Sequence, residues 1–115
     1  MIEQIRPADV AAWLSQGEGG ANAAPVLLDV REPWERQTAS VSPEGVTVVA
    51  IPMNEIPARL GELDPDQRVA CLCHHGGRSQ HVAMYLQHQG FTQLANVSGG
   101  IDAWSVTLDP QVPRY

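Results

Sequence analysis

Short apolar runs alternate with polar or amphipathic stretches along this chain. Four runs have the length and composition of strands, namely 25–30, 46–51, 69–72 and 94–97. The first two are short and mostly apolar, and 46–51 is rich in β-branched residues, so both are predicted to be buried on both faces. Runs of this kind are typical of a parallel sheet.

Helical segments are predicted between these runs. One helix begins at Pro7, and another runs from Ser79 to Gln89 and stops before Gly90, which tolerates a left-handed backbone. The alternation of strands and helices predicts an α/β fold whose sheet is covered on both faces. The other expected features are helices over 31–36, 55–60 and around Trp104, a Gly-rich loop over 17–22 and a turn over 64–66.

The length and composition fit one globular domain. The 115 residues are 43% apolar and 17% charged, which is typical of a folded protein with a single core. No apolar run approaches the roughly 20 residues that a membrane span needs. The first residues also lack the basic and apolar blocks of a signal peptide, so we expect a soluble, cytoplasmic protein.

The charge pattern limits the partners. The formal net charge is −6, and all seven cations are Arg. This balance argues against nucleic acid or an anionic membrane as a partner, because both require a basic patch. It still allows a small anionic ligand wherever positive potential is concentrated locally.

The two cysteines are predicted to differ in role. Cys71 and Cys73 are so close that a disulfide between them would cross-link almost nothing, so reduced thiols in a reducing compartment are expected. Cys71 lies inside a predicted strand, on the same face as Cys73 but one step deeper. We interpret it as an apolar filler of the core.

The segment 73–79 carries the candidate chemistry. It directly follows a predicted strand and opens a helix, where free backbone N–H groups and the positive end of the helix dipole favour anions. The same potential favours the nucleophilic thiolate of Cys73. A purely structural role is the alternative, in which Cys73 is an inert core cysteine and the Gly pair forms only a tight turn. The predicted anion-binding residues are His74, His75, Gly76, Gly77, Arg78 and Ser79.

A metal centre is another interpretation of this segment. Cys71, Cys73, His74 and His75 offer four potential ligands in five residues. Structural zinc sites draw their ligands from two separated pairs, so we predict no metal here. Two further histidines, on the following helix, are expected to face outward.

The loop from Cys73 to Arg78 resembles the active-site loop of the rhodanese family, in which a Cys opens a six-residue turn before a helix. Three further segments match family motifs in the correct order. They are Asp-Val-Arg-Glu at 29–32, Ile-Pro at 51–52, and Gly-Phe at 90–91 followed by a Gly-Gly-hydrophobic-x-x-Trp element at 99–104. The joint order and spacing make the match specific.

The resemblance implies a single three-layer domain over 1–115, with a central, mainly parallel five-stranded sheet flanked by helices. It implies a sulfurtransferase in which Cys73 takes sulfane sulfur from thiosulfate or a similar donor and passes it, as a persulfide, to cyanide or a thiol. The loop amides and Arg78 would hold the donor, and no cofactor is implied. A thioredoxin-like acceptor stays open, as does whether Asp29, Arg31 and Trp104 support the site or only the fold.

One departure from the family pattern concerns 38–45. Family members usually carry a Gly-His-Ile-Pro-Gly-Ala-like segment there, whereas this chain reads Thr-Ala-Ser-Val-Ser-Pro-Glu-Gly and has no His. We expect stability or the shape of the substrate site to differ. The nucleophile itself is unaffected.

Two other functions compete with sulfur transfer. Cys-dependent phosphatases and arsenate reductases place one residue more between Cys and Arg than the four found here, and no leaving-group acid is evident. A catalytically idle protein-interaction module would be expected to lose the Cys or the Gly-rich turn, and this chain retains both. The tail 108–115 receives no assignment, since covering an edge and contacting a partner fit equally well.

Overall fold

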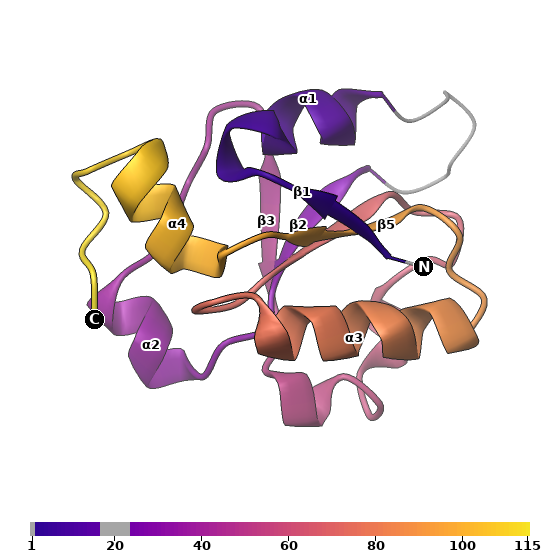
Figure 1. Ribbon diagram of the computed structural model, residues 1–115. Helices are drawn as coiled ribbons and strands as arrows, with labels where there is room; N and C mark the ends of the chain where they lie inside the picture. The colour runs from indigo at the N-terminus through magenta and orange to yellow at the C-terminus, as the bar shows by residue number, and fades with distance from the viewer. Residues whose placement is uncertain (1, 17–23) are drawn as a thin grey trace.

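The computed structural model describes residues 2–16 and 24–115 and contains a five-stranded sheet in which every neighbouring pair of strands is parallel (Figure 1). The strand order is β1–β5–β4–β2–β3. The strands are β1 (Glu3–Ile5), β2 (Val26–Asp29), β3 (Thr47–Ala50), β4 (Val69–Leu72) and β5 (Leu94–Val97). The α-helices are α1 (Val10–Ser15), α2 (Pro33–Thr38), α3 (Gly77–His88) and α4 (Gly100–Thr107), and short 3-10 helices are η1 (Pro7–Asp9), η2 (Met53–Glu55) and η3 (Leu60–Glu62).

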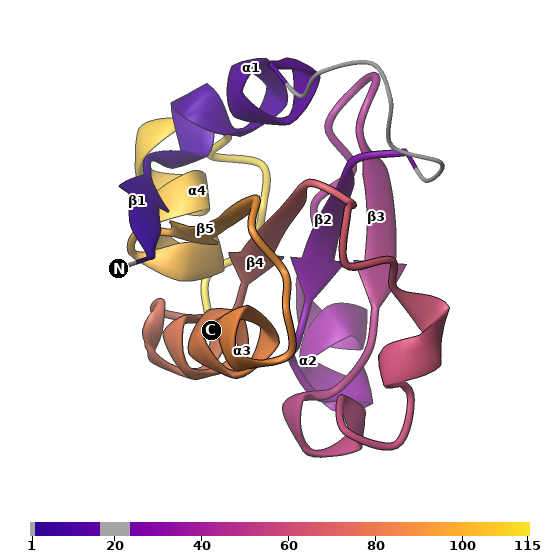
Figure 2. The same ribbon diagram turned by 90° about the vertical axis from the view of Figure 1, so that its right-hand side faces the viewer.

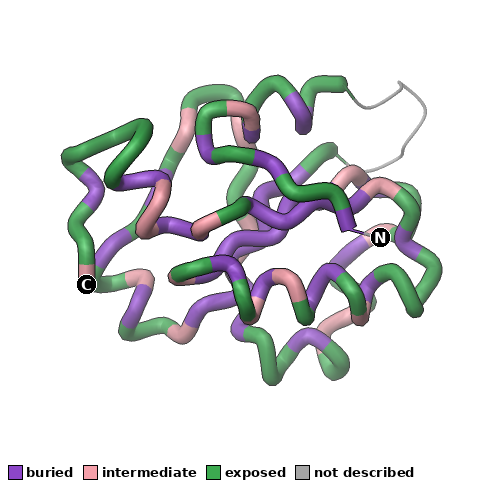
Figure 3. The backbone as a smooth tube through the Cα atoms, in the orientation of Figure 1, coloured by how far each residue is buried: buried purple, intermediate pink, exposed green. Residues whose placement is uncertain are grey.

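Helices cover both faces of the sheet, which confirms the α/β architecture. In Figure 1, α1 lies above the sheet and α3 lies below it, and Figure 2 shows the same layers from the side. One core cluster packs α1, α4 and the tail residue Val112 against one face of the sheet, and a second packs α3 and Ile56 against the opposite face. β2, β4 and β5 are buried at every position, as their continuous purple in Figure 3 shows.

Two strands differ from the sequence-based prediction. β1 was not predicted, because three residues are too short to show a periodic pattern; it pairs with β5 at one edge of the sheet. The prediction that 46–51 is buried on both faces was wrong for β3, which is the opposite edge strand and leaves Val48 38% exposed. A hydrophobic run identifies a strand but not its place in the sheet.

The predicted helix over 55–60 was also wrong. This segment instead consists of turns between η2 and η3. Ile56 nevertheless inserts into the core, so the segment covers the sheet without forming a regular helix. The turn over 64–66 is confirmed, since Asp64 Oδ1 accepts a hydrogen bond from the N–H of Asp66. The Gly-rich loop expected over 17–22 lies outside the described residues.

The strand register brings the candidate residues to one end of the sheet, where the strands have their carboxyl ends. Asp29 of β2 lies opposite Leu72 of β4, so Arg31 and Cys73 leave the sheet at the same carboxyl end. The first turn of α3 and the N-terminus of α4 begin at this end as well. In an open parallel sheet this is where ligands bind. Within the described part of the chain, no helix has the length and apolar character to cross a membrane.

Candidate active site

Cys73 follows β4 directly and is enclosed by the loop that leads to α3. Its side chain is 1% exposed, and the backbone N–H of Gly76 donates a hydrogen bond to Sγ at 3.0 Å. Gly76 has a φ of +106°, which is unfavourable for any residue with a Cβ. The left-handed residue turns the loop back so that its amide faces the sulfur. This is the turn that the Gly pair predicted.

The N-terminus of α4 holds the loop from the other side. The N–H groups of Ile101 and Asp102 donate to the carbonyl oxygens of Cys73 and His74, at 2.8 and 3.1 Å. Gly100 makes this approach possible, because a Cβ there would lie 2.4 Å from the Cys73 oxygen. The Gly-Gly element near the end of the chain therefore shapes the Cys73 loop, and the α4 amides bind loop carbonyls.

The first turn of α3 supplies the positive potential at the sulfur. The first N–H groups of a helix have no acceptor within that helix, and the dipole adds partial positive charge there. α3 has 12 residues and begins at Gly77, and the hydroxyl of Ser79 in its first turn lies 3.2 Å from the Cys73 sulfur. The arrangement favours negative charge on Cys73 or on a ligand bound beside it.

Arg78 is engaged with a partner that the sequence did not reveal. Its two terminal nitrogens bind the two carboxylate oxygens of Glu35 on α2, at 2.6 and 2.7 Å. Glu35 is buried, and the hydrogen bonds from Arg78 lower the pKa of its carboxyl to about 2. Arg78 thus ties α2 to the loop while its cation remains near Cys73. Its binding of a donor remains a prediction.

Asp29 and Arg31 form a buried pair beneath α2. Arg31 donates from Nε and Nη2 to the two carboxylate oxygens of Asp29, at 2.9 and 2.7 Å, and its side chain is fully buried. Its Nη1 reaches the carbonyl oxygen of Glu35 and the hydroxyl of Tyr115. In this position Arg31 supports α2 and the tail rather than facing solvent.

Tyr115 is a site residue that sequence reasoning missed. Its hydroxyl donates to Glu35 Oε2 at 2.7 Å and accepts from Arg31 Nη1 at 3.1 Å. Its ring stacks on His74 with a centroid separation of 3.9 Å, and His74 stacks on His75 at the same separation. The tail therefore folds back onto the Cys73 loop. No local signal predicts this, because the contacts span about 80 residues of chain.

His74, His75 and Asp102 lie close enough to raise the question of a metal ion. One potential ligand atom of each lies within 4.8 Å of the others. The two rings are stacked with an interplanar angle of 22°, so their in-plane lone pairs do not converge on one point. The carboxylate of Asp102 already forms an ion pair with Arg114, with 2.9 Å between Oδ1 and Nε. Burial, followed by the influence of His75, lowers the pKa of His74. The donor set in this arrangement does not fit a metal centre.

A chain of polar side chains leads from the Cys73 sulfur toward the surface. Ser79 contacts Asn96 of β5, which contacts Gln4 of β1. Ser79 was predicted from the sequence, whereas Asn96 and Gln4 were not. Asn96 is a polar residue within a short apolar run, and this was the available sequence signal. A polar side chain that is buried in a strand requires hydrogen-bond partners.

Cys71 and Trp104 lie in the core. Burial, with a smaller influence of Cys73, raises the pKa of Cys71 to about 12, so this thiol is not a nucleophile at neutral pH. Trp104 packs in the cluster on the face opposite that of Cys73. It fills the core and does not line the loop. His81 and His88 are exposed, as predicted.

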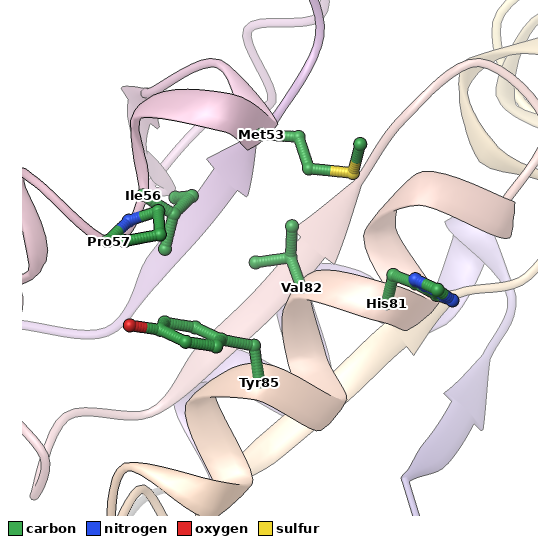
Figure 4. A pocket seen from close by; sticks show the side chains of 6 residues that line it. All are labelled: Met53, Ile56, Pro57, His81, Val82 and Tyr85. Atoms are coloured by element: carbon green, nitrogen blue, oxygen red, sulfur yellow. The ribbon is translucent and has the colours of Figure 1, made fainter.

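An apolar pocket of about 200 Å³ lies between η2 and α3 (Figure 4). Its lining is mainly aliphatic and aromatic, and it has no cluster of N–H donors or cations that would hold an anion. This pocket is therefore distinct from the site around the Cys73 sulfur. The residues that line it are Met53, Ile56, Pro57, His81, Val82 and Tyr85.

Together, the fold and the site define an α/β protein with a buried cysteine enclosed by a Gly-rich loop at the carboxyl end of a parallel sheet. The chain belongs to the rhodanese-like domain family, whose model matches residues 10–107. A rhodanese-related protein from Thermoplasma volcanium has the same fold, with a TM-score of 0.75 and 28% identity over 98% of this chain and 99% of that chain.

Curated relatives include proteins named for sulfur transfer. A sulfurtransferase from Allochromatium vinosum is 35% identical over 70% of this chain and 71% of its own length. A chloroplastic rhodanese-like/PpiC domain-containing protein of Arabidopsis thaliana is 41% identical over 77% of this chain, which spans 30% of that protein. An adenylyltransferase and sulfurtransferase from Zea mays is matched over 20% of its length. These relatives support a role in sulfur transfer in general.

Proposed function

We propose that this domain transfers sulfane sulfur through a persulfide on Cys73. The observation that carries the proposal is the hydrogen bond from the Gly76 amide to the Cys73 sulfur at the N-terminus of α3. The thiolate that attacks the donor carries negative charge on Sγ, and preorganised N–H donors stabilise such charge. The buried Cys71 offers no comparable environment.

The reaction has two steps. The Cys73 thiolate attacks the outer sulfur of a donor such as thiosulfate, the sulfur–sulfur bond of the donor breaks, and sulfite leaves with the bonding electron pair. Cyanide or a thiolate then attacks the outer sulfur of the Cys73 persulfide. The product is thiocyanate or a new persulfide, and Cys73 returns as a thiolate. A small thiol or a thioredoxin-like protein is our proposed physiological acceptor.

The loop amides and Arg78 are proposed to hold the anionic donor. Arg78 stays protonated because Glu35 raises the pKa of its guanidinium, and a third of its side chain remains exposed beside the loop. Since the Cys73 side chain is 1% exposed, the donor reaches it only after side chains at the rim have moved. We propose that the stack of Tyr115 on His74, the residue that follows Cys73, is part of this barrier.

Intact-protein mass spectrometry tests the proposal. The reduced protein is treated with thiosulfate and then with cyanide, alongside Cys73→Ser and the matched control Cys71→Ser. We expect a gain of one sulfur atom that cyanide removes, that persists in Cys71→Ser and that Cys73→Ser abolishes. Uptake that depends on Cys71 would refute Cys73 as the nucleophile. No uptake from any of several sulfane donors would refute sulfur transfer and favour a catalytically idle interaction module.

A further inference from the structure

A chain of hydrogen bonds, buried at Ser79 and Asn96, runs from the Cys73 sulfur through three elements to the exposed Gln4. Ser79 Oγ of α3 lies 3.2 Å from Sγ and also contacts Asn96 Oδ1 of β5. Asn96 Nδ2 donates to Gln4 Oε1 at 2.9 Å. Ser79 and Asn96 are 0% and 3% exposed, so each polar atom here depends on its protein partners.

Two backbone carbonyls determine the direction of this chain. A carbonyl oxygen can only accept, so the side-chain amide that meets it must present its nitrogen. Gln4 Nε2 meets the oxygen of Ile2 at 3.3 Å, and Gln4 therefore turns Oε1 toward Asn96. Asn96 Nδ2 also meets the oxygen of Gly76 at 3.2 Å. Both contacts orient Asn96 so that its Oδ1 faces Ser79.

The Ser79 hydroxyl has one hydrogen for three acceptors in its reach. The contact with Asn96 Oδ1 is shorter than those with Cys73 Sγ at 3.2 Å and Gly76 O at 3.3 Å. When the hydrogen serves Asn96, a lone pair of Ser79 faces the sulfur. A thiol can donate into that lone pair, whereas a thiolate has no hydrogen to donate and is repelled by it.

We propose that Asn96 is a positioning residue that directs the Ser79 hydroxyl away from Cys73 in the resting thiol and releases it to the sulfur when the sulfur is charged. In the thiol state Cys73 donates to Ser79, which donates to Asn96. In the thiolate state the Ser79 hydrogen turns to Sγ, because a hydrogen bond to a charged acceptor is stronger than one to an amide. Asn96 Oδ1 then loses a partner, so Asn96 opposes formation of the thiolate.

The consequence for sulfur transfer rests on the proposed function, while the direction of the hydroxyl does not. In a persulfide the negative charge lies on the outer sulfur, and Sγ becomes a weak acceptor. The Ser79 hydrogen then returns to Asn96. Asn96 thereby favours the thiol and persulfide states over the free thiolate, which limits oxidation of the idle cysteine.

Replacing Asn96 removes none of the charged or titratable groups of the loop and of the elements beside it. They come from every element that meets the loop, and none of them contacts Asn96 through a hydrogen bond that the structure records. They are Asp29 and Arg31 after β2, Glu35 on α2, Cys71 on β4, His74 and His75 in the loop, Arg78 on α3, Asp102 on α4 and Tyr115 in the tail.

The test is the pH profile of Cys73 alkylation by iodoacetamide, read by peptide mass spectrometry. Asn96→Ala removes the competing acceptor, so Ser79 donates to the thiolate freely. We expect the midpoint of the profile to fall by about one pH unit, which is a roughly tenfold gain in thiolate at pH values below it. An unchanged or higher midpoint would overturn the proposal. Because sulfur transfer is not measured, the result is independent of the proposed function.

Ser79→Ala is the matched control. Ser79→Ala alone should raise the midpoint, because the thiolate loses its hydroxyl donor. If Asn96 acts through Ser79, Asn96→Ala should cause no further change in a Ser79→Ala background. A shift as large as in the wild-type background would mean that the change merely admits water or loosens Gly76, and the proposal would fail.

A second measurement needs no substitution of Asn96. The infrared S–H stretch reports whether a thiol donates a hydrogen bond, and Cys71→Ala identifies the band of the other thiol. We expect the Cys73 band of the unmodified protein to show a donated hydrogen bond that Ser79→Ala removes. A free Cys73 S–H, or a band that Ser79→Ala leaves in place, would contradict the proposed direction.

Discussion

Arg78 and Glu35 form a bidentate ion pair across the rim of the Cys73 loop, with N···O distances of 2.6 and 2.7 Å. The pair joins α2 to the first turn of α3, and Tyr115 adds a third hydrogen bond to the same carboxylate. One buried carboxylate therefore organises the loop, a helix and the tail. Its environment leads to the first two predictions.

Stability should depend on the ionisation of Glu35. Its pKa is about 2 in the folded protein and 4.5 without the fold, so its contribution is complete above pH 4.5 and is lost as the pH falls toward 2. The contribution is about 3 kcal/mol. Urea unfolding of the wild type and Glu35→Gln from pH 7 to pH 2.5 should show a difference that narrows with acidification. A constant difference over this range would rule out the ionised carboxylate as its source.

The structural and electrostatic roles of Arg78 can be separated. Arg78→Ala leaves the buried Glu35 charge without its partner and should cost about 2 kcal/mol of unfolding free energy. Adding Glu35→Gln should restore most of this stability but not the missing cation. We expect sulfur uptake from thiosulfate to stay about tenfold slower in both variants. Normal uptake in the stable double variant would show that Arg78 serves only the fold.

Gly100 should be required for the shape of the Cys73 loop. A Cβ at this position would lie 2.4 Å from the Cys73 oxygen and 2.5 Å from that of His74. Gly45 is a matched control, because it also has a positive φ but open space around its Cα. Gly45→Ala should cost about 1 kcal/mol, and Gly100→Ala should cost more and abolish persulfide formation. Equal losses of stability with normal sulfur uptake would contradict the packing argument.

Tyr115 should restrict access to Cys73. Tyr115→Ala removes both the stack on His74 and the hydroxyl contacts, whereas Tyr115→Phe removes only the latter. We expect Tyr115→Ala to speed alkylation of Cys73 by a bulky maleimide several-fold more than alkylation by iodoacetamide. Tyr115→Phe should lie near the wild type. If both reagents gain equally, Tyr115 is not a steric barrier at the rim.

Local patterns predicted the parts of the fold that depend on neighbouring residues. The buried strands at 26–29, 69–72 and 94–97, the long helix before Gly90 and the loop that opens with Cys73 are all found in the structure. Each arises from hydrophobic periodicity or from the backbone preferences of Gly and Pro. The position of Cys73 at the carboxyl end of a strand follows from the same signals, whereas the central place of that strand in the sheet does not.

The tertiary structure alone decided which distant residues meet. The edge position of β3, the pairing of β1, the partner of Arg78 and the contacts of Asn96 and Tyr115 join positions that are far apart in the chain. The sequence by itself determined the class of fold and the candidate nucleophile, because periodicity and turn chemistry act over a few residues. The ion pairs and hydrogen bonds around that nucleophile were decided by three-dimensional packing, since buried polar groups bind whatever the fold brings within reach.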